Sequence, residues 1–388
     1  MPFFLYLWGL KTRIYMKLTK IFLTISIILL PVLASAQSIT LGSCTTKDGG
    51  EYNGEMAQGK PHGKGKTVWK NGNWYEGDYV KGKRQGTGTY VFSDGERYEG
   101  QWVDDHQHGQ GTYWFMNNNR YEGLWYTDYQ HGHGIMYYYN GDVYDGVWYQ
   151  DKRQGKGRYT FSSGSYYDGE WKEDLKNGQG TFYWSDGSSY EGEWLANKKH
   201  GKGTYKYSNG DVYIGQWADD LQEGRGICRF QNGDIYEGDY KKGERTGTGI
   251  IKYDNGDQYT GQFVNGEKSG QGSVVWANGN TYSGQWKADA PNGKGKLTSK
   301  QGDTLEGTFK NGMPNGECVG HRADGSKFKV EFKDGVRNGK AIEEDKEGLR
   351  FEGNYVNGHR DGDFVEKDRN GNITAQGSYV NGRRTLTP

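Results

Sequence analysis

A spacing of 23 residues constrains this chain more than any other feature. A glycine lies two residues after each copy of a recurring tyrosine, and a large ring lies four residues after all but the first, where Met56 stands. The phase then continues through Leu305, Phe328 and Phe351. The tyrosines at this unbroken spacing are Tyr52, Tyr75, Tyr98, Tyr121, Tyr144, Tyr167, Tyr190, Tyr213, Tyr236, Tyr259 and Tyr282. A fixed period of this length indicates a repeat architecture, in which each copy contacts mainly its neighbours.

The composition excludes several other kinds of chain. Of 388 residues, 65 are Gly, and 31 Tyr, 14 Phe and 13 Trp supply most of the large apolar side chains. Disordered chains are poor in aromatic residues. Collagen needs Gly at every third position and abundant proline, and only 6 Pro are present. We therefore expect an ordered β protein whose core is built from rings.

Alternation of residue types within each copy predicts strands. Tyr98, Gly100 and Trp102 share one face of one strand, and Tyr90 precedes them on the neighbouring strand. A three-residue loop over residues 93–95, with a left-handed glycine at its end, pairs Tyr90 with Tyr98 and places all rings on one face. A two-residue loop would send the two sets of rings to opposite faces, so we favour the longer loop.

The other turn of each copy needs an even number of residues by the same argument. Asn265-Gly266 and Asn311-Gly312 suit a two-residue type I′ turn. The predicted fold is all-β, an elongated, single antiparallel meander of about 14 hairpin repeats and about 29 strands. The residues that we expect to build each copy are Tyr75, Gly77, Tyr98, Gly100, Trp102, Gly109, Gly111, Tyr121, Gly123, Trp125, Tyr144, Gly146, Trp148, Tyr167, Gly169, Trp171, Tyr190, Gly192 and Trp194.

The N-terminal segment is typical of a secretory signal peptide over residues 16–36. Lys17 and Lys20 precede an apolar run over residues 21–33, and Ala34-Ser35-Ala36 forms a small-residue cleavage site. Residues 1–15 are interpreted as an upstream start artefact. An uncleaved N-terminal anchor and a lipidated Cys44 are the alternatives. We favour export to the periplasm, the cell surface or the medium.

The charge balance gives no attraction to nucleic acid. The whole chain has 49 basic and 49 acidic residues, and removing residues 1–36 removes four of the basic ones, which leaves 45 against 49. The segment over residues 63–67 superficially resembles a phosphate loop, but Lys60 stands where such a loop needs its first glycine. We expect neither a nucleotide nor any other cofactor.

Histidines supply the one candidate metal constellation. His106, His108, His131 and His133 lie in two adjacent copies, and His-x-His on a strand places both imidazoles on one face. Because no acidic or cysteine ligand shares their phase, we favour ordinary loop residues and no metal. Carboxylate pairs such as Asp104-Asp105 fall in turns, so we expect no catalytic residues.

The repeat unit resembles the MORN repeat, the membrane occupation and recognition nexus. The resemblance rests on the sequence YEGQW from Tyr98 to Trp102 and HGQGTY from His108 to Tyr113, and it covers about residues 42–388. Copies within 37–297 are regular, and those within 298–388 resemble degenerate MORN-variant units. The resemblance implies a curved antiparallel sheet and a role in scaffolding, membrane association or self-association rather than catalysis.

Three functions compete. The leading hypothesis is an exported, non-catalytic scaffold that binds a protein partner or itself. The second is peripheral association with phospholipid headgroups through basic loops such as Lys81-Lys83-Arg84, although nearby acids give those loops mixed charge. The third is glycan binding, in which Trp125 and Trp148 stack on sugar rings, against the alternative that these rings pack on each other.

Overall fold

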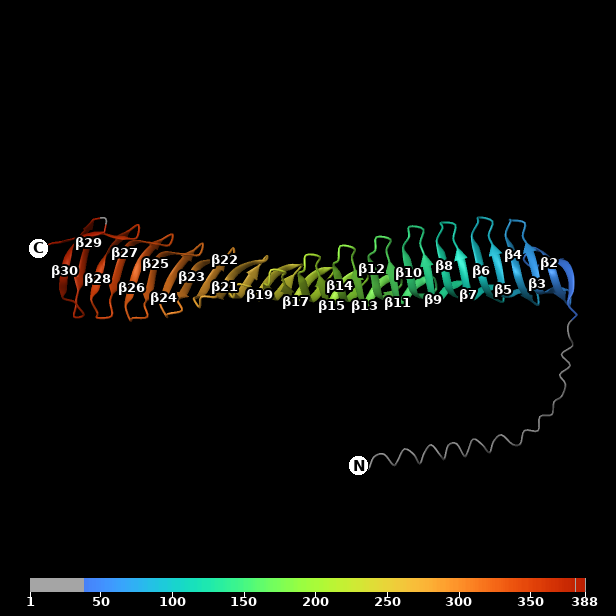
Figure 1. The fold of residues 1–388 in the computed structure, drawn as a ribbon, viewed down its shortest axis with the longest axis horizontal. Coiled ribbons are helices and arrows are strands. Elements are labelled where there is room, and N and C mark those ends of the chain that lie inside the picture. Colours follow the sequence, from blue (N-terminus) through green and yellow to red (C-terminus); the bar gives the residue numbers. More distant parts are fainter. Residues whose placement is uncertain (1–37, 381, 388) are drawn as a thin grey trace, which may run out of the picture.

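The computed structural model describes residues 38–380 and 382–387, which form a single elongated sheet of 31 strands (Figure 1). This confirms the predicted antiparallel meander, with two strands more than expected. None of the described residues is helical, so this part of the chain holds no helix that could cross a membrane. The expected signal peptide lies outside the described residues.

The strands follow one another with short turns. Their bounds are β1 (Thr40–Thr45), β2 (Glu51–Ala57), β3 (Lys60–Val68), β4 (Trp74–Val80), β5 (Lys83–Val91), β6 (Arg97–Val103), β7 (His106–Trp114), β8 (Arg120–Tyr126), β9 (Tyr129–Tyr137), β10 (Val143–Tyr149), β11 (Lys152–Thr160), β12 (Tyr166–Lys172), β13 (Leu175–Tyr183), β14 (Ser189–Leu195), β15 (Lys198–Lys206), β16 (Val212–Ala218), β17 (Leu221–Arg229), β18 (Ile235–Lys241), β19 (Glu244–Lys252), β20 (Gln258–Val264), β21 (Glu267–Val275), β22 (Thr281–Lys287), β23 (Ala290–Thr298), β24 (Thr304–Lys310), β25 (Met313–His321), β26 (Lys327–Lys333), β27 (Val336–Glu344), β28 (Arg350–Val356), β29 (His359–Lys367), β30 (Ile373–Val380) and β31 (Arg383–Leu386).

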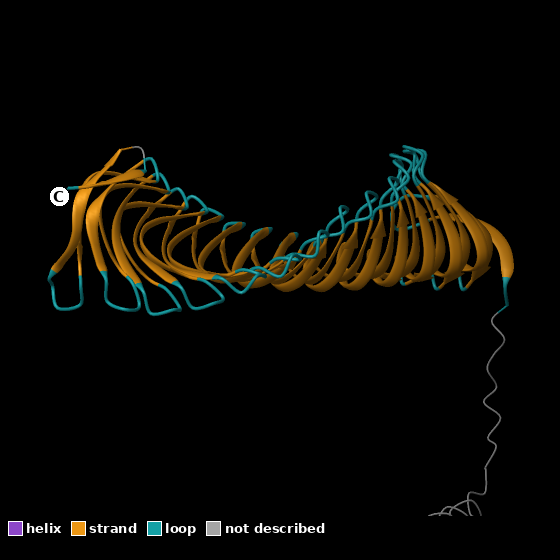
Figure 2. Cartoon of the chain, turned by 60° about the vertical axis from the view of Figure 1, so that its left-hand side comes forward, coloured by secondary structure: helices purple, strands orange, loops and turns teal. Residues whose placement is uncertain are grey.

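Each strand pairs antiparallel with the strand that follows it in the chain. Figure 2 shows that the strands are bent along their length and that the turns form two rows along the long edges of a twisted strip. Such a strip exposes both of its faces, because no second layer of described residues covers either one.

The three-residue turn has the predicted register. Tyr90 pairs with Tyr98 across it. The amide of Phe92 donates to the carbonyl of Glu96 at 2.9 Å, and the amide of Gly95 donates to the carbonyl of Phe92 at 3.0 Å. Gly95 has φ 97°, a left-handed conformation that glycine adopts without strain. The rings of both strands therefore point to one face, as expected.

The two-residue turn is also as predicted. Both of its residues are left-handed, with φ 51° at Asn265 and 84° at Gly266, which defines a type I′ turn. In several copies neither position is glycine, as at Asp104 (φ 50°) and Asp105 (φ 75°). Asp tolerates this conformation better than most residues.

The sequence did not reveal a bulge in the first half of each longer strand. Gly100 pairs with Gly111, yet its neighbour Gln101 pairs with His108, so two residues of β7 have no direct partner on β6. Gly109 lies at the bulge with φ 58°. Because the bulge adds two residues, the alternation of side chains between the two faces is unchanged, and each side chain points to the face that the sequence predicted.

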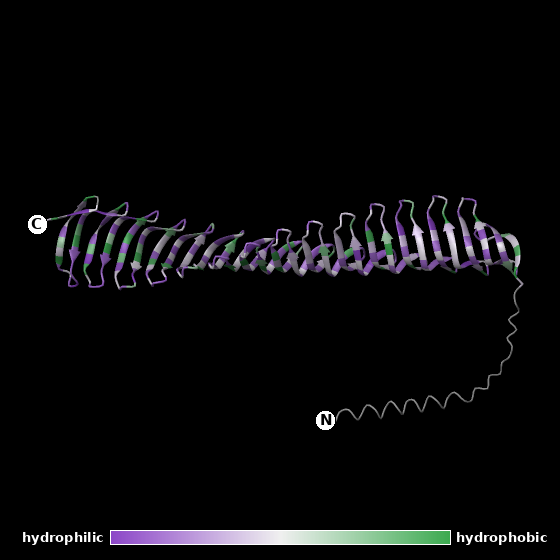
Figure 3. Ribbon diagram, viewed as in Figure 1, coloured by the Kyte–Doolittle hydropathy of each residue, from purple (hydrophilic) through white to green (hydrophobic). Residues whose placement is uncertain are grey.

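The core is a row of tyrosines on one face of the sheet. Each of the eleven tyrosines at the 23-residue spacing is at most 1% exposed. Each ring lies across a pair of glycines, and a β-carbon on Gly111 would overlap the hydroxyl of Tyr98. We call this side the aromatic face, and we call the side that carries Glu99, Thr89 and Arg97 the polar face. Hydrophilic, intermediate and hydrophobic residues are interspersed along the strands, without a continuous hydrophobic band (Figure 3).

The last copies keep the sheet but change its core. Leu305 stands in the tyrosine position, and Cys318 occupies the glycine position beneath it. Phe351 and Phe364 hold the same two positions two copies later, in a second cluster that also contains Val330 and Ala341. The glycine is thus lost in the copies that have lost the tyrosine.

Candidate functional site: the aromatic face

A continuous ladder of rings forms the floor of the aromatic face. Trp102 lies between Tyr98, with ring centroids 5.2 Å apart and an interplanar angle of 88°, and Tyr75, at 5.2 Å and 81°. The same edge-to-face contact recurs from Tyr52 to Phe309 without a break. Edge-to-face pairs each contribute about 0.5–1.5 kcal/mol beyond the area that they bury.

The polar atoms of these rings are bound to backbone carbonyls. The Tyr98 hydroxyl donates to the carbonyl of Gln101 at 2.9 Å, and the Trp102 indole donates to the carbonyl of Gly88 at 3.1 Å. Burial raises the pKa of Tyr98, Tyr236 and Tyr259, and that of the last two reaches about 12. The ladder is therefore a neutral, fully packed layer.

The tryptophans proposed for sugar stacking belong to this layer. Trp125 is 6% exposed and Trp148 is 4% exposed, each between two tyrosines. Their rings pack on other rings rather than standing free at the surface.

A second, half-exposed set of rings runs beside the ladder along the three-residue turns. Phe92 contacts Tyr90 at 4.6 Å and Tyr113 at 5.9 Å between ring centroids. We call this set the outer row; it comprises Trp69, Phe92, Phe115, Tyr138, Phe161, Trp184, Tyr207, Phe230, Tyr253 and Trp276. It ends at Trp276, because the next copies carry Ser299 and Arg322 in its place.

Cations lie over the ladder from the opposite edge. The guanidinium of Arg84 stands 4.5 Å from the Trp102 ring centroid and that of Arg153 stands 4.4 Å from Trp171. Arg84 also contacts Asp105 in the next two-residue turn, with Nε and Oδ1 3.3 Å apart. The guanidinium is thus sandwiched between a ring and a carboxylate, each of which favours its charge.

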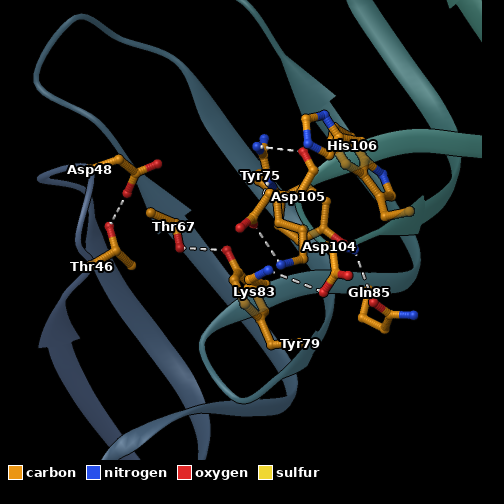
Figure 4. A network of polar contacts seen from close by, with 12 residues as sticks. Thr46, Asp48, Thr67, Tyr75, Tyr79, Lys83, Gln85, Asp104, Asp105 and His106 are labelled. Carbon is orange, nitrogen blue, oxygen red and sulfur yellow. Dashed lines mark hydrogen bonds and ion pairs between the residues drawn. The ribbon is translucent and has the colours of Figure 1, made fainter. Parts of the chain in front are cut away.

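The carboxylate pairs predicted to occupy turns do so, but the second acid also links adjacent copies. Asp105 Oδ1 accepts a hydrogen bond from the backbone amide of Arg84 at 2.8 Å. Asp104 Oδ1 lies 3.2 Å from Lys83 Nζ (Figure 4). In the same view the hydroxyls of Thr67 and Tyr79 lie 2.6 Å apart. The sequence alone gives little signal for the Asp105 contact, because Asp stands at that turn position in four of the eight copies that carry Arg or Lys at the Arg84 position one copy earlier.

The aromatic face is hollowed over β7 to β12. A cavity of about 660 Å³ there is lined by Phe92, Gln107, Tyr113, Phe115, Asn117, Asn119, Trp125, Asp128, Gln130, Met136, Tyr138, Trp148, Asp151, Arg153 and Asp174. The polar face holds a groove of about 790 Å³ whose side chains form cross-strand ion pairs, such as Lys66 with Glu76 at 3.1 Å.

The four candidate histidines are not brought together. His106 Nδ1 lies 2.5 Å from Asp128, and His133 Nε2 lies 3.0 Å from Asp145. His108 and His131 each pack against the ring of Tyr126. Within the described ranges, no group of three or more His, Cys, Asp or Glu residues is arranged to hold a metal ion. The segment over residues 63–67, which resembles a phosphate loop, lies within β3, and Gly63 is part of the β-bulge of that strand.

The sheet and its ladder define a repeat protein of the single-sheet type. The chain belongs to the MORN-repeat family, since the MORN repeat matches twelve consecutive segments: residues 52–74, 75–97, 98–120, 121–143, 144–166, 167–189, 190–212, 213–235, 236–258, 259–281, 282–304 and 306–327. This confirms the predicted resemblance. A search of curated proteins found no relative.

Solved structures resemble the chain only weakly. The TCP10 domain of Danio rerio CPAP, in complex with a STIL peptide, is 14% identical with a TM-score of 0.30, over 58% of this chain and 96% of that one. The Drosophila melanogaster SAS-4 TCP domain, in complex with a proline-rich motif of Ana2, is 14% identical with a TM-score of 0.27, over 40% and 85%. A streptogramin B lyase has a TM-score of 0.13 at 11% identity, over 72% and 94%. Scores this low carry no conclusion about binding or catalysis.

Proposed function

We propose that this MORN-repeat chain is an exported, non-catalytic scaffold that binds a protein partner along the outer row of its aromatic face. The observation that carries the proposal is the outer row itself: ten rings in register, half-exposed, and uncovered by any second layer among the described residues. A contiguous row of apolar rings that keeps contact with solvent is a candidate interaction site. Aromatic side chains are also the residues that contribute most at protein interfaces.

The charges favour a protein over a lipid surface. Lys83, from the basic loop considered for headgroup contact, pairs with Asp104 at 3.2 Å, and Lys198 in an equivalent loop pairs with Asp219 at 3.0 Å. Binding to anionic lipids needs clusters of unpaired basic residues. The buried tryptophans likewise give little support to stacking on sugars.

Site-specific photo-crosslinking in the cells of origin tests the proposal. Phe115 and Trp114 are adjacent, but Phe115 belongs to the outer row and Trp114 lies on the polar face under the guanidinium of Arg97, 4.7 Å from its ring centroid. Tyr138 and Tyr137 form a second such pair, because Arg120 lies 4.4 Å over Tyr137. We would place benzoylphenylalanine at each of the four positions in turn.

We expect a discrete crosslinked protein from positions 115 and 138 and none from positions 114 and 137. A crosslink to a second copy of the chain would make the scaffold self-associating. Equal labelling from both faces, or labelling of lipid alone, would contradict the proposal. Export is tested in the same cells, since the mature chain should begin near residue 37 and appear outside the cytoplasm.

A further inference from the structure

The cations over the ladder show what this face is built to hold. In the copies of Arg84 and Arg153, a guanidinium fills the space between a tryptophan ring and the Asp of the next turn. Arg153 Nε lies 3.0 Å from Asp174 Oδ1, and its terminal nitrogen donates to the Asp174 carbonyl at 3.0 Å. The geometry is the same twice, and it amounts to a binding site for an arginine side chain that the chain occupies itself.

Two consecutive copies between these keep the acid and lose the cation. Gln107 and Gln130 stand at the arginine position, while Asp128 and Asp151 keep the turn position. Asp128 accepts the backbone amide of Gln107 at 2.8 Å and lies beside His106, and Asp151 accepts the backbone amide of Gln130 at 2.8 Å. No ion pair with arginine or lysine reaches either carboxylate within the described ranges.

The cavity of about 660 Å³ lies at these two copies, lined by Trp125, Trp148 and both aspartates. Gln107 is 7% exposed and Gln130 is 5% exposed, and both line the cavity. Among the described residues, neither amide counts as a fully buried group without a hydrogen-bond partner, so the amide atoms remain open to the cavity. With two carboxylates beside them, they offer acceptors to a cationic ligand.

We propose that this cavity binds two basic side chains of the partner, with one guanidinium group at Asp128 and one at Asp151, each bonded by the carboxylate and by the amide oxygen of Gln107 or Gln130. The inference rests on the proposed protein-binding function and specifies the partner's chemistry. Arg153 also lines the cavity, but Asp174 balances its charge. Within the described ranges Asp151 forms no ion pair and the ionic contact of Asp128 is with His106 alone, so these two carboxylates leave the cavity acidic.

The spacing of the two sites selects the conformation of the bound segment. Adjacent copies are two strands apart, about 9.6 Å. In a polyproline II segment, residues i and i+3 lie on the same side and about 9.3 Å apart. Extended β conformation would turn those two side chains to opposite faces. The structure therefore points to an arginine-x-x-arginine segment in polyproline II conformation.

Fluorescence anisotropy with the purified chain tests this inference. The probe is a labelled Pro-Pro-Arg-Pro-Pro-Arg-Pro-Pro peptide, and its control has citrulline, the neutral isostere, in place of both arginines. The double variant Gln107→Arg/Gln130→Arg fills both sites with residues that neighbouring copies already carry, so it should fold. Gln222→Arg makes the same change at the same repeat position, in a copy whose turn carries Gly243 instead of Asp.

We expect saturable binding of the arginine peptide, at least about tenfold weaker binding of the citrulline peptide, and a similar loss in the double variant, since both changes remove the contacts between guanidinium and carboxylate. Gln222→Arg should bind as the parent chain does. Equal binding of both peptides, unchanged binding by the double variant, or no saturable binding would overturn the inference. If the double variant still crosslinks the partner from positions 115 and 138, the scaffold function stands and only the proposed binding of arginine in the cavity is wrong.

Discussion

The ring of Tyr98 lies flat over Gly111 on the neighbouring strand, and its hydroxyl occupies the space in which a β-carbon on that glycine would stand. Every regular copy repeats this contact, which joins the repeat's tyrosine to its second glycine. The contact explains why residue 111 must be glycine. Its backbone is not left-handed, so the backbone conformation alone would allow other residues there.

Gly111→Ala should therefore destabilise the sheet locally, by about 1–3 kcal/mol, as forced overpacking does. Hydrogen exchange of β6, β7 and β8 measures the effect, because long repeat arrays unfold in parts. Thr112→Ala, on the polar face of the same strand, serves as the control. Equal protection in the two variants would refute the steric account.

The C-terminal copies indicate how to relieve that clash. Leu305 stands over Cys318 in the place of tyrosine over glycine. In the copy before them, Gly295→Ala alone should destabilise the chain, and Tyr282→Leu should reduce that cost by about 1 kcal/mol or more in a double-mutant cycle. Additive effects of the two substitutions would show that the tyrosine does not select the glycine.

The sequence predicted the sheet because its period, its alternation and its turn residues act locally. The pairing of Tyr90 with Tyr98 across the three-residue turn followed from the requirement that all rings point to one face. The bulge at Gly109 could not be found in this way, since two extra residues do not change the face to which any side chain points. Degeneracy in the last copies was visible in the sequence, but its cause needed the ring of Tyr98 to be seen over Gly111.

The hollow of the aromatic face was likewise beyond the sequence analysis. Gln107 and Asp128 lie 21 residues apart, and neither is unusual for a repeat of this kind. Only the observed contact between Arg84 and Asp105, one copy earlier, shows that the two positions meet across adjacent turns. The histidines, which are conspicuous in the sequence, prove to be separate residues in the structure.

Alkaline pH should unfold the chain. Burial raises the pKa of the core tyrosines above the ordinary value of about 10, to about 12 for Tyr52, Tyr236 and Tyr259. Their contribution to stability is complete below pH 10 and is lost as pH rises through the folded-state pKa, since only the unfolded state releases these protons readily. Tyrosinate absorbance and loss of β circular dichroism should rise together above about pH 11. Ionisation of the core tyrosines without loss of structure would contradict this account.

The three cysteines should differ in reactivity. Cys228 and Cys318 are buried, and burial raises the pKa of both thiols, that of Cys228 to about 11. At pH 8 a thiol with that pKa is about 0.1% thiolate, the reactive form. Cys44 is half-buried and should react with Ellman's reagent first. Cys44→Ser should abolish the fast phase of the reaction, and unfolding in urea should make Cys228 and Cys318 reactive. Equal reaction rates for all three thiols in the native chain would be inconsistent with this burial.

Lys176 should make stability depend on pH in the weakly alkaline range. Burial lowers its pKa to about 8, and its ammonium stands 4.3 Å from the Trp194 ring centroid with Asn197, rather than Asp, in the next turn. Between about pH 8 and 10.4 the unfolded chain holds this proton and the folded chain does not, so stability rises with pH. Urea unfolding should show that rise, and Lys176→Met should remove it.

Asn197→Asp supplies the matched test of the same point. It reproduces the pairing of Arg153 with Asp174 one copy earlier and should raise the pKa of Lys176 toward its ordinary value. Stability near pH 7 should then increase, and the alkaline rise should become smaller. A rise that persists unchanged in both variants would assign it to another group.

The unbroken ladder from Tyr52 to Phe309 also sets a scale of length. Because each copy bonds mainly to the next, inserting or deleting one 23-residue unit would lengthen or shorten the molecule by about 9.6 Å and leave both ends unchanged. A chain of this kind can hold two attached bodies at a distance fixed by copy number alone. Gene-level gain or loss of repeats would then adjust that distance in uniform steps, as graduations do on a ruler.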